Sequence, residues 1–353
     1  MQMTPAHNSQ LQLSASLSGH VQKVSTCAMS SDGRWLASAG VDKKVLIWSV
    51  PDKELKCTID GPEGHTGNIT NARFSPDDRL ILGTASNDST VRIWDLTPLA
   101  QGTASTIKAL QVLRGHKMVV TAVDFCPSIG SKYCVSCDGD GELRLWDFMT
   151  GHCEQVIKLV AKPVYSPNQV RYHPQNPNIV AVAIGQVLYM VQINDSKSQH
   201  RTISTNHVKH ISTLDWAAQG NYLVTASEDQ VCVWDTVQPA QWRVLTTHQS
   251  PKISSCVFLK SEPRNGAAGT TAGAGQSATT RLAYGDYEKI WIWTFTGNGY
   301  MRSVPLADPQ AHPGAAVTAL ACSTSNLDGE NAVVLASASA GKDGNLKLWR
   351  VLG

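Results

Sequence analysis

A short strand that ends in Trp and a polar residue recurs throughout this chain. Its clear copies are VLIWS ending at Ser49, VRIWD at Asp95, LRLWD at Asp147, VCVWD at Asp235, WIWT at Thr294 and LKLWR at Arg350. A degenerate copy, VLYMVQ at 187–192, has Val191 in the place of Trp. Successive copies lie about 43 to about 59 residues apart, which suits a repeating unit of four strands, since such a unit needs roughly 40 to 45 residues.

Each Trp strand is preceded by two other short strands. The first set starts at Val24, Ile69, Val120, Gln169, Ile211, Ile253 and Val317. The second set reads WLASAG, LILGTAS, YCVSCD, IVAVAIG, YLVTASE, RLAYGD and VVLASAS. These segments are rich in small and β-branched residues, and turn sequences such as SSDG and SPDD bound them. Three strands that each occur seven times predict an all-β fold, a seven-bladed β-propeller.

The two ends of the chain complement each other. The last unit stops at Gly353 without room for a fourth strand, whereas LQLSASL at 11–17 precedes the first unit and has no partner there. We therefore expect the N-terminal strand to complete the last blade, so that the closed ring leaves no open edge. The propeller then spans 11–353, after a disordered tail at 1–10. The Gly/Ala/Ser/Thr-rich segment 261–280 is interpreted as a flexible insertion between the first two strands of blade 6.

Composition narrows the class of function. The formal net charge of +2 over 353 residues argues against a dedicated nucleic-acid binder, which usually presents a strongly basic face. The first residues lack the basic and apolar regions of a signal peptide, and no stretch has the length and apolarity of a membrane span. We therefore expect a reducing compartment, and nine free Cys rather than a disulfide framework.

A His, a Ser or Thr, an Asp and a Trp recur at similar offsets within the units. The clear sets are His20, Ser38, Asp42 and Trp48; His65, Thr84, Asp88 and Trp94; and His116, Ser136, Asp140 and Trp146. Weaker versions start at His207, His248 and His312. A nucleophilic triad occurs once in an enzyme and needs an exposed hydroxyl, whereas these sets repeat beside a Trp whose buried N–H needs an acceptor. We interpret them as structural hydrogen-bond networks and predict no catalytic residue.

Two other motifs have the residue types of metal sites. Cys134 and Cys137 form a CxxC, but on a strand they point to opposite faces, and no second CxxC or His pair completes a zinc site. The turn Asp138-Gly-Asp-Gly-Glu142 is similar to part of a calcium loop but lacks the Glu at loop position 12. There is no Gly-rich loop that opens a helix to cradle a phosphate. We predict no metal site and no cofactor.

The repeat pattern across 11–353 resembles the WD-repeat superfamily. Within it, the chain is most similar to the C-terminal propeller of the plant LEUNIG family of Groucho-like transcriptional co-repressors. The segments that carry this resemblance are SDGRWLASAGVDKKVLIW (31–48), DFCPSIGSKYCVSCDGDGELRLW (124–146), ASEDQVCVW (226–234), SCVF (255–258) and DGNLKLW (343–349).

The resemblance implies a nuclear scaffold that binds proteins or short peptide motifs. Its partners would be transcription factors, adaptors and co-repressor components, with no direct contact to nucleic acid or membrane. The family also carries an amino-terminal LisH-type region and a Gln-rich stretch, which this sequence lacks. The chain is therefore either a fragment of a longer co-repressor or a short relative that is recruited differently.

Partner-binding residues are expected on the top face of the propeller. There, loop residues just after the Gly-His positions and in the turn between the second and third strands surround the central channel. By spacing they are Lys23, Asn68, Val119, His210 and Lys252, together with Val41, Asn87, Gly139, Glu228 and Lys342. This mixed ring suits a short peptide with acidic and apolar anchors better than a nucleic acid.

Other functions are weighed against the co-repressor hypothesis. Substrate receptors of cullin-type ubiquitin ligases resemble each other in a Trp-Asp-x-Arg box, and WDLT, WDFM and WDTV do not supply its Arg. A cytoplasmic signalling scaffold with a small helical partner is a further alternative. An enzyme with its active site in the channel would need clustered His or carboxylates there, and we expect mainly Ser, Thr, Ala and Val.

Replacing Asp88 by Ala tests the structural interpretation of the His–Ser/Thr–Asp–Trp sets. Loss of the carboxylate leaves buried polar groups unpaired, at roughly 1–3 kcal/mol each. We therefore expect a lower melting temperature for the variant. An unchanged thermal melting curve would contradict the interpretation.

Overall fold

The computed structural model describes most of the chain. The described ranges are 11–160, 167–194, 198–205, 207–236, 243–249, 253–260, 279–287, 289–296, 306–308, 311–327, 330–341 and 345–352. The predicted tail at 1–10 lies outside them. Of the predicted insertion at 261–280, residues 261–278 also lie outside them, whereas Thr279 and Thr280 belong to a strand.

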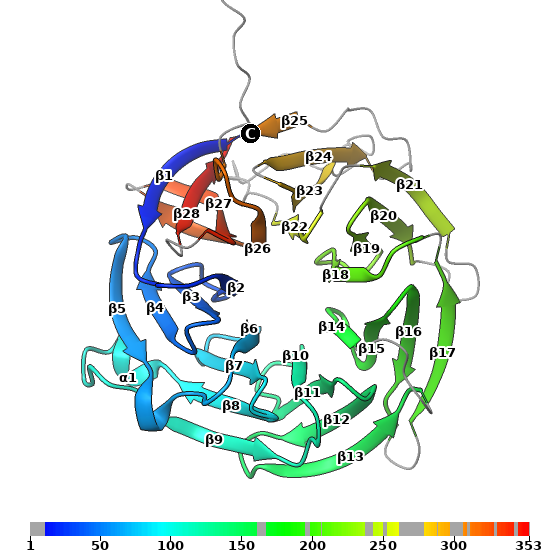
Figure 1. The fold of residues 1–353 in the computed structure, drawn as a ribbon, viewed down its shortest axis with the longest axis horizontal. Coiled ribbons are helices and arrows are strands. Elements are labelled where there is room, and N and C mark those ends of the chain that lie inside the picture. The colour runs from blue at the N-terminus through cyan, green and yellow to red at the C-terminus, as the bar shows by residue number, and fades with distance from the viewer. Residues whose placement is uncertain are drawn as a thin grey trace, which may run out of the picture.

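Seven four-stranded antiparallel sheets surround a central axis, as Figure 1 shows. Blade 1 contains β2 (Val24–Met29), β3 (Trp35–Gly40), β4 (Val45–Ser49) and β5 (Glu54–Ile59). Blade 2 contains β6 (Ile69–Phe74), β7 (Ile81–Ser86), β8 (Thr90–Asp95) and β9 (Ala109–Arg114). Blade 3 contains β10 (Val120–Phe125), β11 (Tyr133–Asp138), β12 (Glu142–Asp147) and β13 (His152–Lys158).

The remaining blades repeat this order from the axis outward. Blade 4 contains β14 (Pro167–His173), β15 (Asn176–Ile184), β16 (Val187–Gln192) and β17 (Gln199–Ser204). Blade 5 contains β18 (Ile211–Trp216), β19 (Tyr222–Ser227), β20 (Gln230–Asp235) and β21 (Arg243–Gln249). Blade 6 contains β22 (Ser255–Leu259), β23 (Thr279–Gly285), β24 (Ile290–Thr296) and β25 (Leu306–Asp308). The seven-bladed all-β prediction is confirmed.

Blade 7 is assembled from both ends of the chain. It contains β26 (Val317–Leu327), β27 (Glu330–Ser339), β28 (Leu346–Val351) and β1 (Leu11–Leu17), in the order β26-β27-β28-β1. In the register of β1 and β28, Leu11 faces Val351 and Leu17 faces Leu346. Figure 1 shows the blue β1 beside the red β28. The predicted closure by the N-terminal strand is confirmed.

Each Trp of the repeat fills the interface with the preceding blade. Trp94 of β8 packs against Ala37 and Ile47 of blade 1, and Trp48 packs against Ala336 of blade 7. In blade 4, Val191 occupies the corresponding interface with blade 3. Large aromatic side chains supply much of the buried apolar area that holds neighbouring sheets together.

Polar side chains join the inner strands, which belong to different sheets. The backbone N–H of Ala72 donates to Thr26 Oγ1 at 3.1 Å, and that of Val123 donates to Asn71 Oδ1 at 3.2 Å. Further along the ring, the N–H of Leu320 donates to Ser255 Oγ at 3.0 Å. These bonds satisfy inner-edge backbone groups that no ladder reaches.

Helices are short. In the described part of the chain they are the 3₁₀ turn η1 (Gly61–Glu63) and α1 (Thr97–Ala100). Within the described ranges, no helix has the length and apolar character needed to cross a bilayer. All nine Cys are free thiols, as expected, and most of them are buried.

Candidate functional site

The first predicted set forms a continuous hydrogen-bonded chain in blade 1. His20 Nδ1 lies 2.8 Å from Asp42 Oδ2, and His20 Nε2 lies 2.8 Å from Ser38 Oγ. Trp48 Nε1 donates to the same Ser38 Oγ at 2.9 Å. Since a carboxylate accepts only, Nδ1 carries the proton, Nε2 accepts from the hydroxyl, and the hydroxyl oxygen accepts from the indole. Every group in the chain therefore has a partner.

Blade 2 repeats the same geometry. His65 lies 2.8 Å from both Asp88 Oδ2 and Thr84 Oγ1, and Trp94 Nε1 donates to Thr84 at 2.9 Å. Thr90 Oγ1 also donates to Asp88, at 2.6 Å. Burial would raise the pKa of Asp88, but the hydrogen bonds from His65 and Thr90 outweigh it and hold this pKa well below its usual range. The side chain of Asp88 is therefore ionised at neutral pH and is held in place by these hydrogen bonds.

In blade 3 the predicted Asp140 is wrong, because Asp138 takes its place. His116 Nδ1 lies 3.0 Å from Asp138 Oδ2, while Nε2 lies 2.7 Å from Ser136 Oγ, to which Trp146 donates at 2.8 Å. Asp138 ends β11 two residues after Ser136, so both side chains point to the same face of the strand. Asp140 lies exposed in the following turn, where its N–H donates to Asp138 Oδ1.

The weaker sets are also assembled where the structure describes them. His207 contacts Thr225 at 2.8 Å and Ser227 at 2.9 Å, and Trp234 donates to Thr225 at 2.8 Å. In blade 7, His312 and Trp349 both lie 2.8 Å from Ser337 Oγ. The side chain of His248 lies outside the described part of the chain.

These networks are unsuited to nucleophilic catalysis. The hydroxyl-bearing residues Ser38, Thr84 and Ser136 are completely buried, so no substrate reaches the oxygen. Each hydroxyl also accepts from an indole N–H, which lowers its nucleophilicity. The arrangement orders the loop that enters each blade against the second and third strands.

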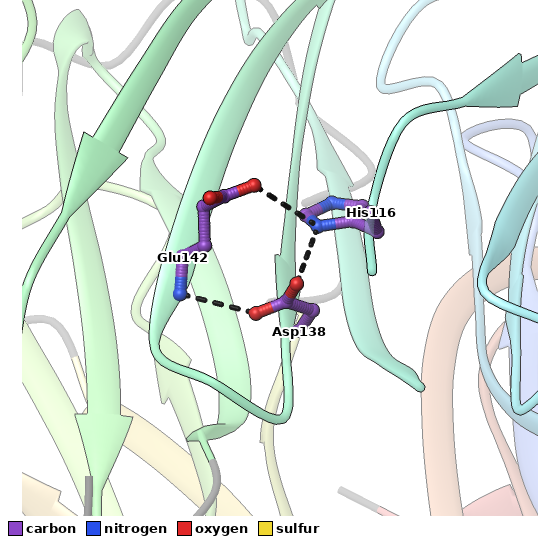
Figure 2. A group of neighbouring side chains, drawn as sticks. All are labelled: His116, Asp138 and Glu142. Atoms are coloured by element: carbon purple, nitrogen blue, oxygen red, sulfur yellow. Dashed lines mark hydrogen bonds and ion pairs between the residues drawn. The ribbon is translucent and has the colours of Figure 1, made fainter. Parts of the chain in front are cut away.

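Among the described residues, His116, Asp138 and Glu142 form a group whose ligand atoms could hold a metal ion, and Figure 2 shows them converging. The atoms of these residues that would bind a metal already take part in hydrogen bonds. Asp138 accepts from His116 and from the N–H of Glu142, and Glu142 Oε1 accepts from Arg144 Nε at 2.6 Å. A metal would require the lone pair of His116 Nδ1, which carries the proton donated to Asp138. The donor chemistry fits a hydrogen-bonded network.

The CxxC pair has the geometry of two separate core residues. Cys134 packs at the interface of blades 2 and 3, and Cys137 packs at the interface of blades 3 and 4. Burial raises the pKa of the Cys137 thiol to about 12, and that of Cys134 further still. Both thiols are therefore protonated at neutral pH.

The described residues of the predicted partner-binding set lie on the face that carries the loop His residues, here called the His face, and we refer to them as its rim. Three pairs are joined by backbone hydrogen bonds: Val41 to Lys23 at 3.0 Å, Asn87 to Asn68 at 2.9 Å and Gly139 to Val119 at 2.9 Å. Lys23, Asn87, His210 and Glu228 are exposed, and Val41, Asn68, Val119 and Gly139 are partly exposed. Lys252 and Lys342 lie outside the described residues.

Comparison with known proteins agrees with this geometry. The family model of the WD domain, G-beta repeat, matches residues 11–49, 55–95, 107–147 and 198–235. This chain is a WD-repeat propeller. The remaining blades of the propeller have the same strand order although their sequences depart further from the repeat.

Proteins with several different names are similar to this WD-repeat propeller. The transcriptional corepressor LEUNIG_HOMOLOG of Arabidopsis thaliana is 29% identical over 328 residues, which cover 93% of this chain and 35% of that protein. Pre-mRNA-processing factor 19 of Oryza sativa subsp. japonica is 27% identical over 63% of this chain and 40% of its own length. The guanine nucleotide-binding protein subunit beta of Zea mays is 27% identical over 61% of this chain and 56% of its own length. The chain thus spans about a third to about a half of these relatives.

Exposed apolar side chains on the His face were missed by the sequence analysis. Val21 is 69% exposed, Met118 44% and Val208 75%, and each stands one or two residues after a loop His. Their position in the sequence, just after a Gly-His dipeptide or after His207, could have indicated that they lie on this face. They add apolar contacts to the polar rim of the WD-repeat propeller.

The expectation of mainly Ser, Thr, Ala and Val in the channel is confirmed for its narrow part, but it missed four charged residues at one mouth. Arg73, Asp124, Arg171 and Asp215 occupy equivalent positions on the inner strands of blades 2 to 5 and line one mouth of the channel. The signal was the residue directly before the aromatic residue of four consecutive first strands, which reads Arg, Asp, Arg and Asp.

A matched pair of variants tests which carboxylate of blade 3 belongs to the network. Asp138→Ala is expected to lower the free energy of unfolding by about 1–3 kcal/mol because His116 loses its acceptor. Asp140→Ala removes an exposed side chain and is expected to stay within about 0.5 kcal/mol of the wild type. Urea unfolding of both variants measures the difference, and equal losses would contradict the assignment.

The network of blade 5 predicts an acid-sensitive contribution to stability. Burial lowers the pKa of His207 from 6.5 to about 4, so the unfolded chain takes up a proton before the folded one does. The contribution of neutral His207 to the free energy of unfolding should be complete above pH 6.5. It should be lost progressively as the pH falls to 4, by about 3 kcal/mol at most.

Urea unfolding across that pH range, with His207→Gln beside the wild type, measures this contribution. The variant should show a shallower loss, whereas the exposed His210→Gln should follow the wild type. Parallel curves for His207→Gln and the wild type would refute the contribution.

Proposed function

We propose that this WD-repeat propeller is a non-enzymatic interaction scaffold of the transcriptional co-repressor type and acts in the nucleus. Similarity to LEUNIG_HOMOLOG, a protein named as a transcriptional corepressor, extends over 93% of the chain and supports this proposal. Its partners would be transcription factors, adaptors or co-repressor components. The near-neutral net charge of +2 favours protein partners over nucleic acid.

The observation that carries the proposal is the composition of the His face. Its rim mixes the exposed Lys23 and Glu228 with Asn87 and His210, and Val21 and Val208 stand exposed among them. Such a surface offers charge-assisted hydrogen bonds at its rim and apolar contacts beside them. It suits a short peptide with acidic and apolar anchors.

A scaffold role also agrees with the buried networks. The Ser and Thr hydroxyls of the sets are buried and engaged, and Asp42, Asp88 and Asp138 are held by their His partners. These groups stabilise the loops that carry the rim. We propose that the propeller acts without catalysis or cofactor.

Charge reversal of the three Lys residues that the sequence predicts for the His face tests the proposal. Lys23→Glu, Lys252→Glu and Lys342→Glu combined should weaken capture of acidic peptide partners and leave the fold intact. The wild type and the triple variant are compared by proximity labelling in the native cell and by thermal melting. The wild type should label nuclear co-repressor components, and the variant should lose them at an unchanged melting temperature.

A second triple variant controls for net charge. Lys108→Glu, Arg114→Glu and Lys158→Glu make the same change on exposed positions outside the rim and should retain the wild-type labelling. Wild-type labelling by the first triple variant would remove the His face from consideration. Ubiquitin-ligase adaptors in the labelled set would favour a substrate receptor instead, and cytoplasmic signalling proteins would favour a signalling scaffold.

A further inference from the structure

The mouth of the channel opposite the His face carries a pattern of alternating charge. The inner strands β6, β10 and β18 each begin after a loop His and end at the other face, and the charged residue of each stands next to its last residue. Arg73, Asp124, Arg171 and Asp215 line a cavity of about 370 Å³ there. In blades 6, 7 and 1 the corresponding residues are Val257, Ala321 and Ala28. Charge is therefore concentrated on one side of the ring.

The two carboxylates of this cavity have structural partners. Asp124 Oδ2 accepts from the backbone N–H of Tyr172 at 2.7 Å, and Asp215 Oδ2 accepts from that of Phe258 at 2.9 Å. Each bond joins one inner strand to the next, as Thr26 and Asn71 do elsewhere in the ring. The carboxylates are thus accounted for by the closure of the ring.

The guanidinium groups of Arg73 and Arg171 do not have such a role in joining the inner strands. Arg73 Nη2 and Arg171 Nε lie 3.9 and 4.0 Å from Asp215 Oδ1, beyond hydrogen-bond distance. Arg171 Nη1 donates to the carbonyl of Val170 at 2.7 Å, but the Nε atoms of both Arg residues have no hydrogen-bond partner within the described chain.

Arg171 is 8% exposed, so its unpaired donor is largely shielded from solvent. Leaving a buried charged donor unpaired is costly. Burial and the neighbouring Arg73 lower the pKa of Arg171 to about 10. An acceptor with a negative charge in the cavity would relieve both effects.

The walls of the cavity indicate the size and character of such a ligand. Phe74, Pro76, Pro127 and Trp216 surround the Arg pair with apolar surface. Farther along the channel, a space of about 50 Å³ is lined by the same two Arg residues. A ligand that enters from this mouth therefore meets the Arg pair where the channel narrows.

We infer that this mouth binds a carboxylate of a partner peptide, with Arg73 and Arg171 as its donors and the Phe74 and Trp216 rings against neighbouring apolar side chains. A guanidinium offers parallel donors that match a carboxylate. The carboxylates of Asp124 and Asp215 repel a doubly charged phosphate more strongly than a singly charged carboxylate. The site lies on the face opposite the proposed co-repressor surface and does not depend on that function.

The probes are the peptide acetyl-Phe-Glu-Phe-amide, its Gln analogue, which has the same shape without the charge, and inorganic phosphate. Calorimetry measures binding to the full chain, and nitrogen-proton NMR follows the Nε–H signals of Arg73 and Arg171. The Glu peptide should bind at least about tenfold more tightly than the Gln peptide and shift both signals. Equal affinity of the two peptides, or unshifted Nε–H signals, would overturn the inference.

Variants locate the site. Arg73→Gln and Arg171→Gln should each abolish the preference for the Glu peptide, and Arg114→Gln, on the exposed outer strand β9, should retain it. If Arg171→Gln lowers the melting temperature so far that its binding cannot be measured, the result for Arg73→Gln, at the less buried position, decides whether the inference holds. Tighter binding of phosphate than of the Glu peptide would overturn the assignment to a carboxylate. The triple Lys variant of the His face should bind the Glu peptide like the wild type, which separates this test from that of the proposed function.

Discussion

The packing of each sheet against both of its neighbours is the contact on which the whole molecule depends. Trp94 lies against Ala37 and Ile47 of the blade before it, and Trp48 reaches back to Ala336 of blade 7. A four-stranded sheet with apolar residues on both faces is not stable alone, so every blade needs two partners. That requirement is met all round when the ring is closed, and pairing of β1 with β28 closes it across the chain ends.

Within that ring, the buried polar networks order the loops that the apolar contacts leave free. Each His is held at one nitrogen by a hydroxyl and, in blades 1 to 3, at the other by a carboxylate. Because every donor has an acceptor, the network orders its loop without leaving an unsatisfied buried group. Four rim residues of the His face stand three positions after these His residues, and three others are hydrogen-bonded to them through the backbone, so the rim is presented on an ordered scaffold.

The two mouths of the channel differ in chemistry. The His face exposes a mixed rim with Val21 and Val208 among polar side chains, whereas the opposite mouth has the buried Arg171 and the partly exposed Arg73 inside aromatic and proline walls. Both features come from the same inner strands and the loops before them.

The number of blades, the closing strand and most members of the His networks were determined by the sequence itself, because each follows from a local pattern repeated along the chain. Tertiary structure decided the rest. Asp138 and Asp140 stand two residues apart beside the same turn, and only the direction of the strand at Asp138 brings one carboxylate to His116. The charged channel mouth likewise joins Arg73 to Asp215, residues far apart in sequence that meet because the ring brings the ends of successive inner strands around one axis. Spacing along the chain predicts what recurs, but which of these side chains meet across the axis depends on the ring being closed.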